Sequence, residues 1–581
     1  MGRAADRVRI LEEIVSAPSY AVVGFTHGRL AYTSNEGGVL DLWSMEPDAG
    51  KPLRLTSGGV HIVAPPRSSS PLVVFTRDVS RGRELQGVFA VDVRGGEELG
   101  VEGFEPRRVL GIAFDGRRAA FAAAGGRAVE LWLAEPGGEA EKLHEVEAVM
   151  YVTDYADGLI VGQGVLKGNP TAFELFIYDV GTGEFEVYTP RDGSTNRRPR
   201  VRGSSVLFAT TAFGGEKLMI YDVESGELRE PELTHSDHEK YEFTEYPSFG
   251  WTDDGRIWFV GKRDGRTRVF LDGSEVPTPP GFVSGVAVAG ERVYVSHSSL
   301  ASPPAIYEVF KGSAKRILGA ELSRAVASRI GPTRLVRYKS SDGLEVPAYV
   351  VESRAAPRPG PTVVYVHGGP WSEVADSWNV FIAALAAAGY HVVAPNFRGS
   401  TGYGEEFRRL DVGDPGGGDL EDVVRAAEWA RESGLASRVA IMGYSYGGFM
   451  TFIATVKRPE VWDAGVAGAG IVDWEEMYGL SDSFFRKFIE VLFGGRRELW
   501  RERSAIHYVE RLRAPICILH PQNDSRTPLR PVLRYVQKLV EEGKTFELHV
   551  IPDAGHAIRR IEDALKLLLP AVLFLDRYLG A

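Results

Sequence analysis

The sequence predicts a two-domain protein in which an all-β domain of the propeller type precedes a mainly parallel α/β domain. Three observations support this prediction. Short β runs recur at a regular spacing through the first half, strand-like and helix-like segments alternate through the second half, and a Gly-x-Ser-x-Gly motif lies at residues 443–447. A chain of 581 residues also exceeds what one hydrophobic core usually organises, so two domains are expected.

A repeat runs from residue 24 to about residue 325, where short β runs each precede a turn that contains glycine. Seven turn glycines mark this repeat: Gly50, Gly95, Gly137, Gly183, Gly226, Gly273 and Gly312. Neighbouring markers lie 39 to 47 residues apart. A period of about 40–50 residues is that of one four-stranded propeller blade, so the markers predict a seven-bladed β-propeller. A β-sandwich with coincidental spacing is the alternative.

The second half has the opposite character, because apolar runs typical of strands alternate there with amphipathic helical patterns. Helices are expected at 377–389, 418–433, 448–457, 529–542 and 559–578. This alternation favours a mainly parallel sheet with helices on both faces. Residues 334–351 indicate an antiparallel hairpin that leads into the sheet.

An amphipathic helix is expected at the N-terminus. Val8, Leu11, Ile14 and Val15 share one helical face, and Pro18 ends the helix. Such a helix does not belong in a propeller, so we expect it to pack on the α/β domain. The expected division of the chain is 1–23 for this helix, 24–325 for the propeller and 326–581 for the α/β domain.

The composition argues against several functions and locations. The net charge is −11, and no basic cluster with interleaved aromatic residues occurs, so nucleic acid is not an expected partner. No apolar run reaches the roughly 20 residues that cross a bilayer, so no membrane partner is expected, and the N-terminus lacks a signal-peptide core. The single cysteine, Cys517, allows no intrachain disulfide, and a cytoplasmic location is expected. The oligomeric state stays open, with a homodimer as one option.

The motif Gly443-x-Ser445-x-Gly447 follows an apolar run at 439–442 and precedes a helix-like stretch. A strand, a tight turn and a helix in this order form a nucleophile elbow, which exposes a serine hydroxyl at the tip of the turn. A side chain at position 443 or 447 would collide with the neighbouring backbone. Ser445 is therefore the candidate nucleophile, and an ordinary Gly-rich turn is the alternative.

A serine hydroxyl needs a base, and the base needs an orienting acid. In α/β-hydrolases these residues follow in the order Ser, Asp or Glu, His. Strand-like runs at 515–520 and 546–551 lead into loops that contain Asp524 and His556, where open α/β sheets bind their ligands. We assign Asp524 as the acid and His556 as the base. Two rival acids are Asp473 and Asp553.

An oxyanion intermediate needs two backbone N–H groups that are already in place. One is expected from Tyr446, which follows the serine. The second is expected from Gly369, in the sequence His-Gly-Gly-Pro that ends an apolar strand at 362–366. This is the His-Gly-Gly type of loop found in esterases and peptidases, and its glycines allow close approach of the backbone to substrate. A purely structural turn is the alternative.

Several motifs occur together in the last 250 or so residues. They are HGGPW (367–371), NFRGSTGYGEEF (396–407), GGGDLEDV (416–423), GYSYGGFM (443–450) and NDSRTP (523–528). With this ordered set the chain resembles the prolyl oligopeptidase family of serine peptidases, and within it the acylaminoacyl peptidases, in particular archaeal ones. The resemblance implies that the N-terminal β-propeller caps an α/β-hydrolase domain.

The resemblance also implies residues that bind substrate. Arg526 would bind a substrate carbonyl on the acyl side of the scissile bond, and a structural ion pair is the alternative. The segment after the strand that ends near residue 472 would line the pocket for the residue before the scissile bond. Its apolar side chains are Trp474, Phe485, Phe488 and Leu492. Such a lining favours hydrophobic residues, although these side chains could equally belong to the core.

The preference for a free or a blocked N-terminus depends on paired glutamates. Dipeptidyl peptidases of this family carry such a pair in a helical insert of the propeller. Here Glu97-Glu98 lies in a blade turn and Glu12-Glu13 lies in the N-terminal helix, so a blocked N-terminus is favoured. The segment His235-x-x-His238-Glu239 is interpreted as a charged loop, and neither a metal nor a cofactor is expected.

The sequence therefore predicts a serine peptidase that releases N-acylated amino acids from short peptides, with esterase side activity, through an acyl-enzyme on Ser445. The alternatives are a broader oligopeptidase or a dipeptidyl peptidase of the same family, and then a carboxylesterase. A non-catalytic propeller scaffold is the alternative from a different class, and it would not need all three groups of the triad.

Overall fold

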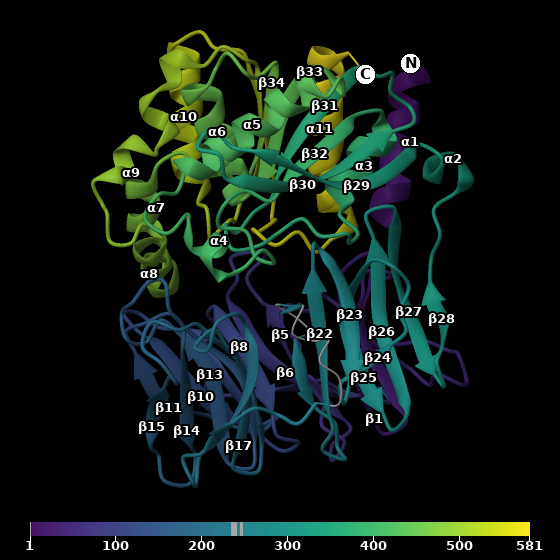
Figure 1. The fold of residues 1–581 in the computed structure, drawn as a ribbon, viewed down its shortest axis with the longest axis vertical. Helices are drawn as coiled ribbons and strands as arrows, with labels where there is room; N and C mark the ends of the chain where they lie inside the picture. Colours follow the sequence, from purple (N-terminus) through teal and green to yellow (C-terminus); the bar gives the residue numbers. More distant parts are fainter. Residues whose placement is uncertain (1, 234–240, 245–247, 581) are drawn as a thin grey trace.

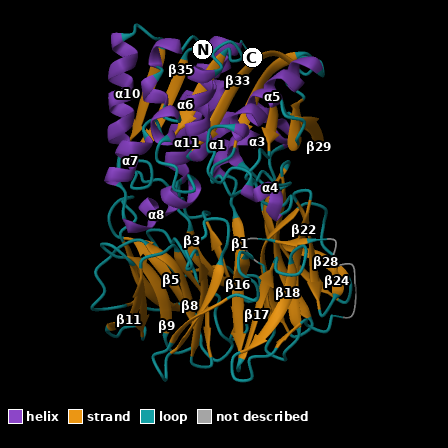
Figure 2. Ribbon diagram, turned by 60° about the vertical axis from the view of Figure 1, so that its left-hand side comes forward, coloured by secondary structure: helices purple, strands orange, loops and turns teal. Residues whose placement is uncertain are grey.

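The computed structural model describes residues 2–233, 241–244 and 248–580. Figure 1 shows an α/β unit above a group of small β-sheets, and Figure 2 shows that the helices gather in the upper unit. His235, His238 and Glu239, which the sequence analysis interprets as a charged loop, lie outside the described residues. Among the described residues, no helix combines the length and apolar character needed to cross a bilayer.

The described part of the lower unit contains seven small antiparallel sheets, which confirms the predicted seven blades. The strands of blades one to three are β1 (Tyr20–Thr26), β2 (Arg29–Ser34), β3 (Asp41–Met45), β4 (Leu53–Arg54); β5 (Leu72–Asp78), β6 (Gln86–Asp92), β7 (Leu99–Gly100); and β8 (Val109–Phe114), β9 (Ala119–Ala124), β10 (Val129–Ala134), β11 (Ala140–Val146). In blade two, Val63 forms an additional antiparallel bridge to Phe75.

The remaining blades continue the same order along the chain. Their strands are β12 (Met150–Ala156), β13 (Leu159–Gly164), β14 (Glu174–Asp179), β15 (Phe185–Tyr188); β16 (Asn196–Arg202), β17 (Ser205–Thr210), β18 (Lys217–Asp222), β19 (Leu228–Arg229); β20 (Glu242–Phe243), β21 (Phe249–Trp251), β22 (Ile257–Arg263), β23 (Arg266–Leu271), β24 (Ser274–Val276); and β25 (Phe282–Ala289), β26 (Arg292–Ser299), β27 (Ser302–Phe310), β28 (Ser313–Gly319).

Turn chemistry explains why the glycine markers recur. In the turn after β18, the Asp222 carboxylate accepts a hydrogen bond from the Ser225 N–H, and the Gly226 N–H donates to the Asp222 carbonyl. Gly226 has a φ of 73°, a left-handed conformation in which a residue with a side chain is strained. The turn after β14 has the same arrangement, because the Gly183 N–H donates to the Asp179 carbonyl at 2.8 Å.

Side chains close the ring between blades one and seven. Each of these blades consists of consecutive strands. The Val22 N–H of blade one donates to the Ser296 hydroxyl of blade seven at 2.5 Å, and the Phe25 and Tyr294 rings stack with centroids 5.7 Å apart. Packing between the sheets of blades one and seven thus closes the ring.

The upper unit contains a sheet of eight described strands in the order β29-β30-β32-β31-β33-β34-β35-β36. Their bounds are β29 (Ile330–Lys339), β30 (Glu345–Ser353), β31 (Gly360–Val366), β32 (His391–Pro395), β33 (Ala436–Tyr444), β34 (Ala464–Gly468), β35 (Ile516–Pro521) and β36 (Phe546–Ile551). The expected hairpin is β29 and β30, and the strands from β32 to β36 pair in parallel.

Helices cover both faces of this sheet, as the alternating pattern predicts. Its two hydrophobic cores involve α1 (Gly2–Ser16), α3 (Val380–Ala388) and α11 (Ile561–Leu579) on one face, and α5 (Gly418–Glu432), α6 (Tyr446–Lys457) and α10 (Leu529–Glu541) on the other. The shorter helices are α2 (Arg324–Ala327), α4 (Glu405–Arg409), α7 (Trp474–Leu480), α8 (Ser483–Leu492) and α9 (Leu499–Glu502). Figure 1 shows α8 reaching down toward the propeller.

The N-terminal helix α1 packs on the α/β unit, beside α3 and α11. Ile10, Leu11, Ile14 and Val15 are buried there, whereas Val8 is only half-buried. The predicted face was therefore slightly rotated, and Ile10 takes the inward position that the sequence analysis gave to Val8.

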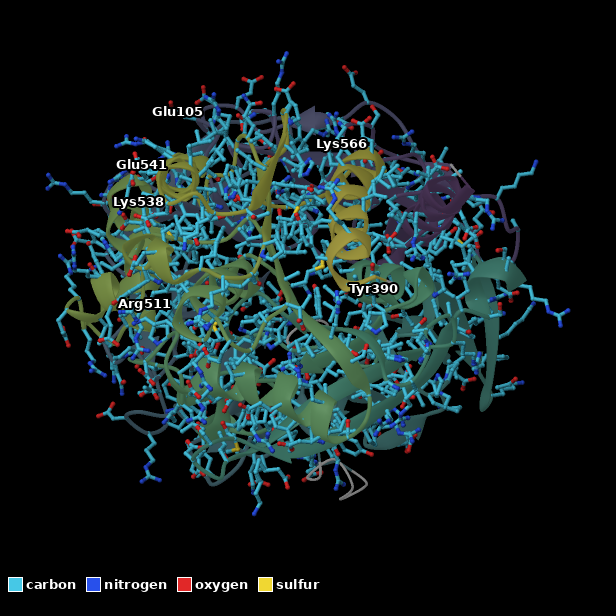
Figure 3. The ribbon with its side chains drawn as sticks, turned by 90° about the horizontal axis from the view of Figure 1, so that it is seen from above. Glu105, Tyr390, Arg511, Lys538, Glu541 and Lys566 are labelled. Atoms are coloured by element: carbon cyan, nitrogen blue, oxygen red, sulfur yellow. The ribbon has the colours of Figure 1, made fainter. Side chains whose placement is uncertain are left out.

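A polar anchor accompanies this apolar contact. The Arg7 guanidinium pairs with Asp576 of α11 at 3.0 Å, and the Tyr390 hydroxyl donates to the same carboxylate at 2.5 Å. Seen from above, Tyr390 lies inside the unit near α11, while Lys538 and Glu541 lie at its rim (Figure 3). Strand β1 already begins at Tyr20, within the range 1–23 expected for the helix.

Candidate active site

Ser445 lies in a sharp turn between β33 and α6. Its φ of 60° and ψ of −119° are strained for a residue with a side chain. A Cβ added to Gly443 would lie 2.4 Å from the Gly447 backbone, and one added to Gly447 would lie 2.0 Å from the Val366 carbonyl oxygen. Only glycine fits at either position, which is the geometry that a nucleophile elbow requires.

Ser445, His556 and Asp524 form one hydrogen-bonded chain. The His556 Nε2 lies 2.9 Å from the Ser445 Oγ, and the His556 Nδ1 lies 2.7 Å from the Asp524 Oδ2. The three residues stand at the ends of β33, β36 and β35, at the carboxyl edge of the parallel sheet. This arrangement can move a proton from the serine hydroxyl to the imidazole.

The Asp524 carboxylate is fully buried and held by its own loop. It accepts hydrogen bonds from the backbone N–H groups of Arg526 and Thr527, both at 2.9 Å, and from the Thr527 hydroxyl at 2.9 Å. Burial opposes ionisation, but the His556 imidazole and these hydrogen bonds outweigh it and lower the pKa of Asp524. The carboxylate thus stays charged and orients the imidazole.

The two rival acids lie elsewhere. The Asp473 carboxylate caps helix α7 by accepting a hydrogen bond from the Glu476 N–H at 3.1 Å. The Asp553 side chain is 66% exposed and lies 4.0 Å from Arg81. Both carboxylates therefore have partners other than His556.

The two expected oxyanion donors border the same cavity as Ser445. Tyr446 begins α6 directly after the serine, and Gly369 follows β31 with a φ of 126°. The Tyr446 hydroxyl donates to the buried Asp419 carboxylate at 2.6 Å. The His367 ring stacks on Phe397, and its Nε2 lies 2.9 Å from the Ser400 hydroxyl. Both loops are thus fixed from behind by buried side chains.

The triad opens into a cavity of about 650 Å³ between the propeller and the α/β unit. Of the predicted pocket residues, Trp474, Phe485 and Phe488 line this cavity, and Leu492 does not. Leu492 is fully buried in the core under the sheet, because α8 turns this face inward. The apolar wall also contains residues that the sequence analysis missed: Tyr151, Trp371, Ile471, Met477 and Phe484. Tyr151 comes from the propeller, so no pattern within the α/β half could reveal it.

Arg526 lines the cavity but is held in an ion pair with the propeller. Its guanidinium donates from Nη2 and Nε to the Glu84 carboxylate at 2.5 and 2.8 Å. Glu84 also accepts from Arg108, which in turn pairs with Asp482 at 2.7 Å. Burial opposes ionisation of Glu84, but the two guanidinium groups lower its pKa. The alternative considered for Arg526, a structural ion pair, is therefore present.

The polar part of the cavity wall is rich in arginine. The arginines that line it are Arg108, Arg197, Arg198, Arg200, Arg408, Arg526 and Arg559. Among the described residues, no aspartate or glutamate lines this cavity. Of the paired glutamates considered in the sequence analysis, Glu98 pairs with Arg77 at 2.7 Å and Glu13 binds Ser323 beside α2. Cationic side chains thus stand beside the apolar wall, and several of them pair with carboxylates that lie outside the cavity lining.

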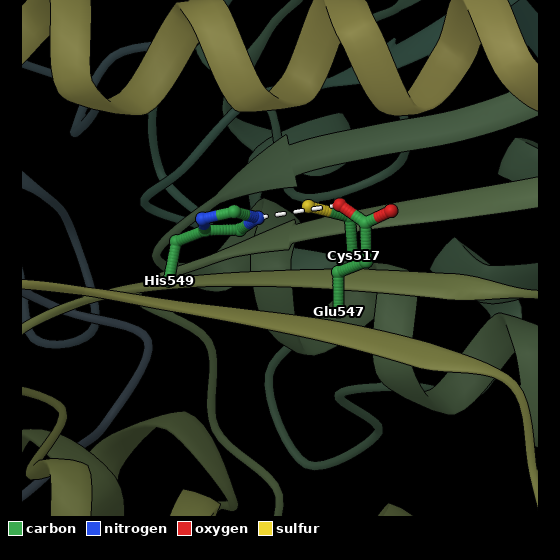
Figure 4. A group of neighbouring side chains, drawn as sticks. All are labelled: Cys517, Glu547 and His549. Carbon is green, nitrogen blue, oxygen red and sulfur yellow. Dashed lines mark hydrogen bonds and ion pairs between the residues drawn. The ribbon is translucent and has the colours of Figure 1, made fainter.

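A separate cluster joins Cys517, Glu547 and His549 on β35 and β36 (Figure 4). The sequence analysis did not foresee it, because the residues come from two strands that only the fold brings together. The His549 Nε2 lies 3.3 Å from Glu547, which also pairs with Arg577 at 2.9 Å. Burial raises the pKa of the Cys517 thiol, and a thiol must lose its proton to bind a metal well. The donor set is therefore poorly matched to a metal ion.

Two family models match the chain. Residues 32–307 match the acylamino-acid-releasing enzyme-like, N-terminal domain, and residues 375–581 match the prolyl oligopeptidase family. An α/β-hydrolase domain capped by a seven-bladed propeller, with a serine in a nucleophile elbow, defines a class of serine hydrolases. The chain belongs to the prolyl oligopeptidase family within that class.

Curated relatives cover part of the chain. The rat acylamino-acid-releasing enzyme is 31% identical over 232 residues, which cover 38% of this chain and 32% of that protein. An uncharacterized peptidase, YuxL, of Bacillus subtilis is 29% identical over 339 residues, which cover 53% and 50%. A dipeptidyl aminopeptidase, BIII, of Pseudoxanthomonas mexicana is 27% identical over 306 residues. The chain thus spans between about a third and half of the length of these relatives.

Solved structures match the fold over nearly the whole chain. A puromycin-hydrolyzing peptidase of Mycobacterium tuberculosis superposes with a TM-score of 0.83 at 18% identity, covering 98% of this chain and 96% of that one. The acylaminoacyl peptidase of Pyrococcus horikoshii superposes with a TM-score of 0.72 at 20% identity, covering 98% and 97%. Both likenesses concern the architecture of the two units.

Proposed function

We propose that this protein is a serine peptidase that releases N-acylated amino acids from the blocked N-terminus of short peptides. The observation that carries the proposal is a Ser–His–Asp chain facing a cavity whose described lining has apolar and cationic side chains but no carboxylate. The match of residues 32–307 to the acylamino-acid-releasing enzyme-like, N-terminal domain and the similarity to the rat acylamino-acid-releasing enzyme support the same activity.

The geometry suggests the following mechanism. His556 takes the proton from Ser445 while the Oγ attacks the carbonyl carbon of the scissile bond. The N–H groups of Tyr446 and Gly369 stabilise the oxyanion, and Asp524 keeps the imidazole in the required orientation. His556 then protonates the leaving amine, and an acyl-enzyme remains on the serine. Water repeats the cycle, with His556 as its base, and releases the N-acylated amino acid.

The preference for a blocked N-terminus rests on the absence of a carboxylate from the described lining of the cavity. A free ammonium buried in the acyl end of the cavity would cost several kcal/mol without an anionic partner. Glu84, a propeller acid that contacts two arginines of the cavity, is already shared between Arg526 and Arg108. An acetyl amide carries no charge and needs only hydrogen bonds, so the blocked substrate is favoured.

A dipeptidyl peptidase is the second candidate, because a dipeptidyl aminopeptidase is among the relatives. The test compares N-acetyl-Phe p-nitroanilide with the free-amine analogue at a pH where that amine is charged. We expect kcat/KM for the blocked substrate to be at least about tenfold higher, a difference of about 1.4 kcal/mol. A preference for the free amine would contradict the proposal and favour an aminopeptidase or dipeptidyl peptidase.

Esterase side activity is part of the proposal, because an ester gives the same acyl-enzyme as an amide.

We also propose a cytoplasmic location, supported by a single buried cysteine. A homodimer is proposed as one assembly, and light scattering of the purified protein measures it directly.

A further inference from the structure

Arg559 stands out among the arginines of the catalytic cavity. It borders the cavity with Ser445 and His556, and its Nε atom is buried. Within the part of the chain that the structure describes, its guanidinium makes no hydrogen bond or ion pair. Each of the other cavity arginines has a partner. Among the described residues, Arg559 is therefore a cation of the cavity that has no ion-pair partner.

The neighbouring carboxylates are already in use. Asp78 and Glu84 both lie close enough to influence Arg559 electrostatically. The Asp78 carboxylate accepts hydrogen bonds from the backbone N–H groups of Ser80 and Gly82, at 2.8 and 2.5 Å. Glu84 binds Arg526 and Arg108. Neither acid therefore forms an ion pair with the Arg559 guanidinium.

The backbone of Arg559 is fixed at the border of the two units. Its carbonyl accepts a hydrogen bond from the Leu40 N–H of the propeller at 3.1 Å, and Arg560 forms an antiparallel bridge with Val39. Burial, with the nearby Arg526, lowers the pKa of Arg559 to about 10, so the group remains cationic at neutral pH. The side chain is thus a positioned positive charge that is costly to leave unpaired.

The substrates of the proposed function carry few charges. An N-acylated peptide has no ammonium at its blocked end, and the only charge that every such peptide carries is its C-terminal carboxylate. During cleavage the leaving peptide lies against His556, which must protonate its amine. Arg559 follows His556 by three positions in the same loop. Arg559 thus lies on the same loop as the residue that meets the leaving amine, the end of the substrate that carries this carboxylate.

We infer that Arg559 binds the C-terminal carboxylate of the leaving peptide; this inference rests on the proposed function. A guanidinium offers two parallel N–H donors to a carboxylate, and such pairs are stronger than neutral hydrogen bonds. An extended chain advances about 3.3–3.6 Å per residue, so only one length of leaving peptide places its carboxylate optimally. Arg559 would thus measure substrate length from the scissile bond to the C-terminus.

The test uses peptides that share one acyl part, N-acetyl-Phe, followed by one to four alanines, each as the free acid and as the C-terminal amide. We expect kcat/KM for the acid to exceed that for the amide by about tenfold or more at one length, since hydrogen bonds to charged groups contribute on that scale. Arg559→Gln should bring the ratio close to one, and Arg559→Lys should restore part of it.

Arg560→Gln is the matched control. Arg560 is the next residue of the loop, its side chain is 61% exposed, and it points to Glu562 rather than into the cavity. This variant should keep the acid preference of the wild-type protein. Active-site labelling with a fluorophosphonate shows that each variant has folded with a reactive serine.

Equal kcat/KM for acid and amide at every length in the wild-type protein would overturn the inference. So would an unchanged ratio in a labelled Arg559→Gln variant. A third overturning result is an Arg559-dependent preference for succinyl-Phe over acetyl-Phe p-nitroanilide, because it would move the anion to the acyl end. Each result leaves the preference for blocked over free amines intact, so failure of the inference is separable from failure of the proposed function.

Discussion

The two walls of the catalytic cavity are built differently. On the α/β side, Ser445, Asp524 and His556 stand on loops at the ends of parallel strands of one sheet, and backbone hydrogen bonds of the same unit fix them. On the propeller side, long side chains such as Arg108 and Tyr151 reach in from blade strands or their ends. The comparison indicates that the proposed reacting groups come from the α/β unit alone, whereas the side chains that would select the substrate come from both units.

Glu84 and Arg526 connect the two walls. Glu84 belongs to the turn between β5 and β6 of the propeller, and Arg526 follows the catalytic acid by two positions. In the same region Gly82 and Gly555 pack so closely that a Cβ on Gly555 would lie 1.8 Å from the Gly82 carbonyl oxygen. The loops of the acid and the base therefore rest directly on the propeller.

The largest expected effect concerns the α/β wall alone. Ser445→Ala or His556→Ala should lower kcat by roughly 10⁴–10⁶ for peptides and esters alike, because both substrates use the same nucleophile and base. Steady-state kinetics on N-acetyl-Phe p-nitroanilide and the p-nitrophenyl ester measures this. Near-normal turnover in either variant would show that the triad assignment is wrong.

A smaller effect is expected where the walls meet. Arg526→Ala should lower kcat/KM for the peptide more than for the p-nitrophenyl ester, because an amide needs precise positioning and an activated ester needs less. Parallel measurement of both substrates gives the ratio. Arg530→Ala is the control, because Arg530 is 71% exposed and pairs with Glu476 outside the cavity. Equal losses for both substrates would indicate a structural role for Arg526.

The smallest effect concerns the docking of the two units. Glu405 of α4 pairs with Arg408 and Arg409 at 2.5 and 2.7 Å and accepts from the Thr195 hydroxyl of the propeller at 2.7 Å. Burial opposes its ionisation, but Arg408 and the other partners lower the pKa of Glu405 to about 2. A depressed pKa contributes stability above the unfolded value near 4.5, and this stability is lost as pH falls toward 2.

Glu405→Gln should therefore lower the melting temperature at pH 7, with a loss of at most ~3 kcal/mol, and lower it less at pH 3. Thermal unfolding of both proteins at the two pH values measures the difference. Glu406→Gln is the matched control, since Glu406 is the exposed neighbour in the same helix. A loss that is the same at pH 3 and pH 7 would rule out a contribution from the ionised carboxylate.

Local patterns predicted the framework of this protein. The spacing of the turn glycines gave the seven blades, because each blade repeats the same hairpin turns. The order of Ser445, Asp524 and His556, each after an apolar run, predicted the residues that the sheet brings together, because parallel strands end at one edge. Strand and turn signals extend over only a few residues, so these elements can be predicted from short stretches of the sequence.

Only the tertiary structure decided how the cavity is closed and charged. Tyr151 and Glu84 reach the site from blades that are hundreds of residues away from the triad, and no local pattern records such contacts. Leu492 was expected in the pocket and lies in the core, because helix position alone does not say what covers each face. The sequence by itself predicted the triad and determined the two folds, while the docking of propeller on hydrolase decided which charges are paired and left Arg559 unpaired among the described residues.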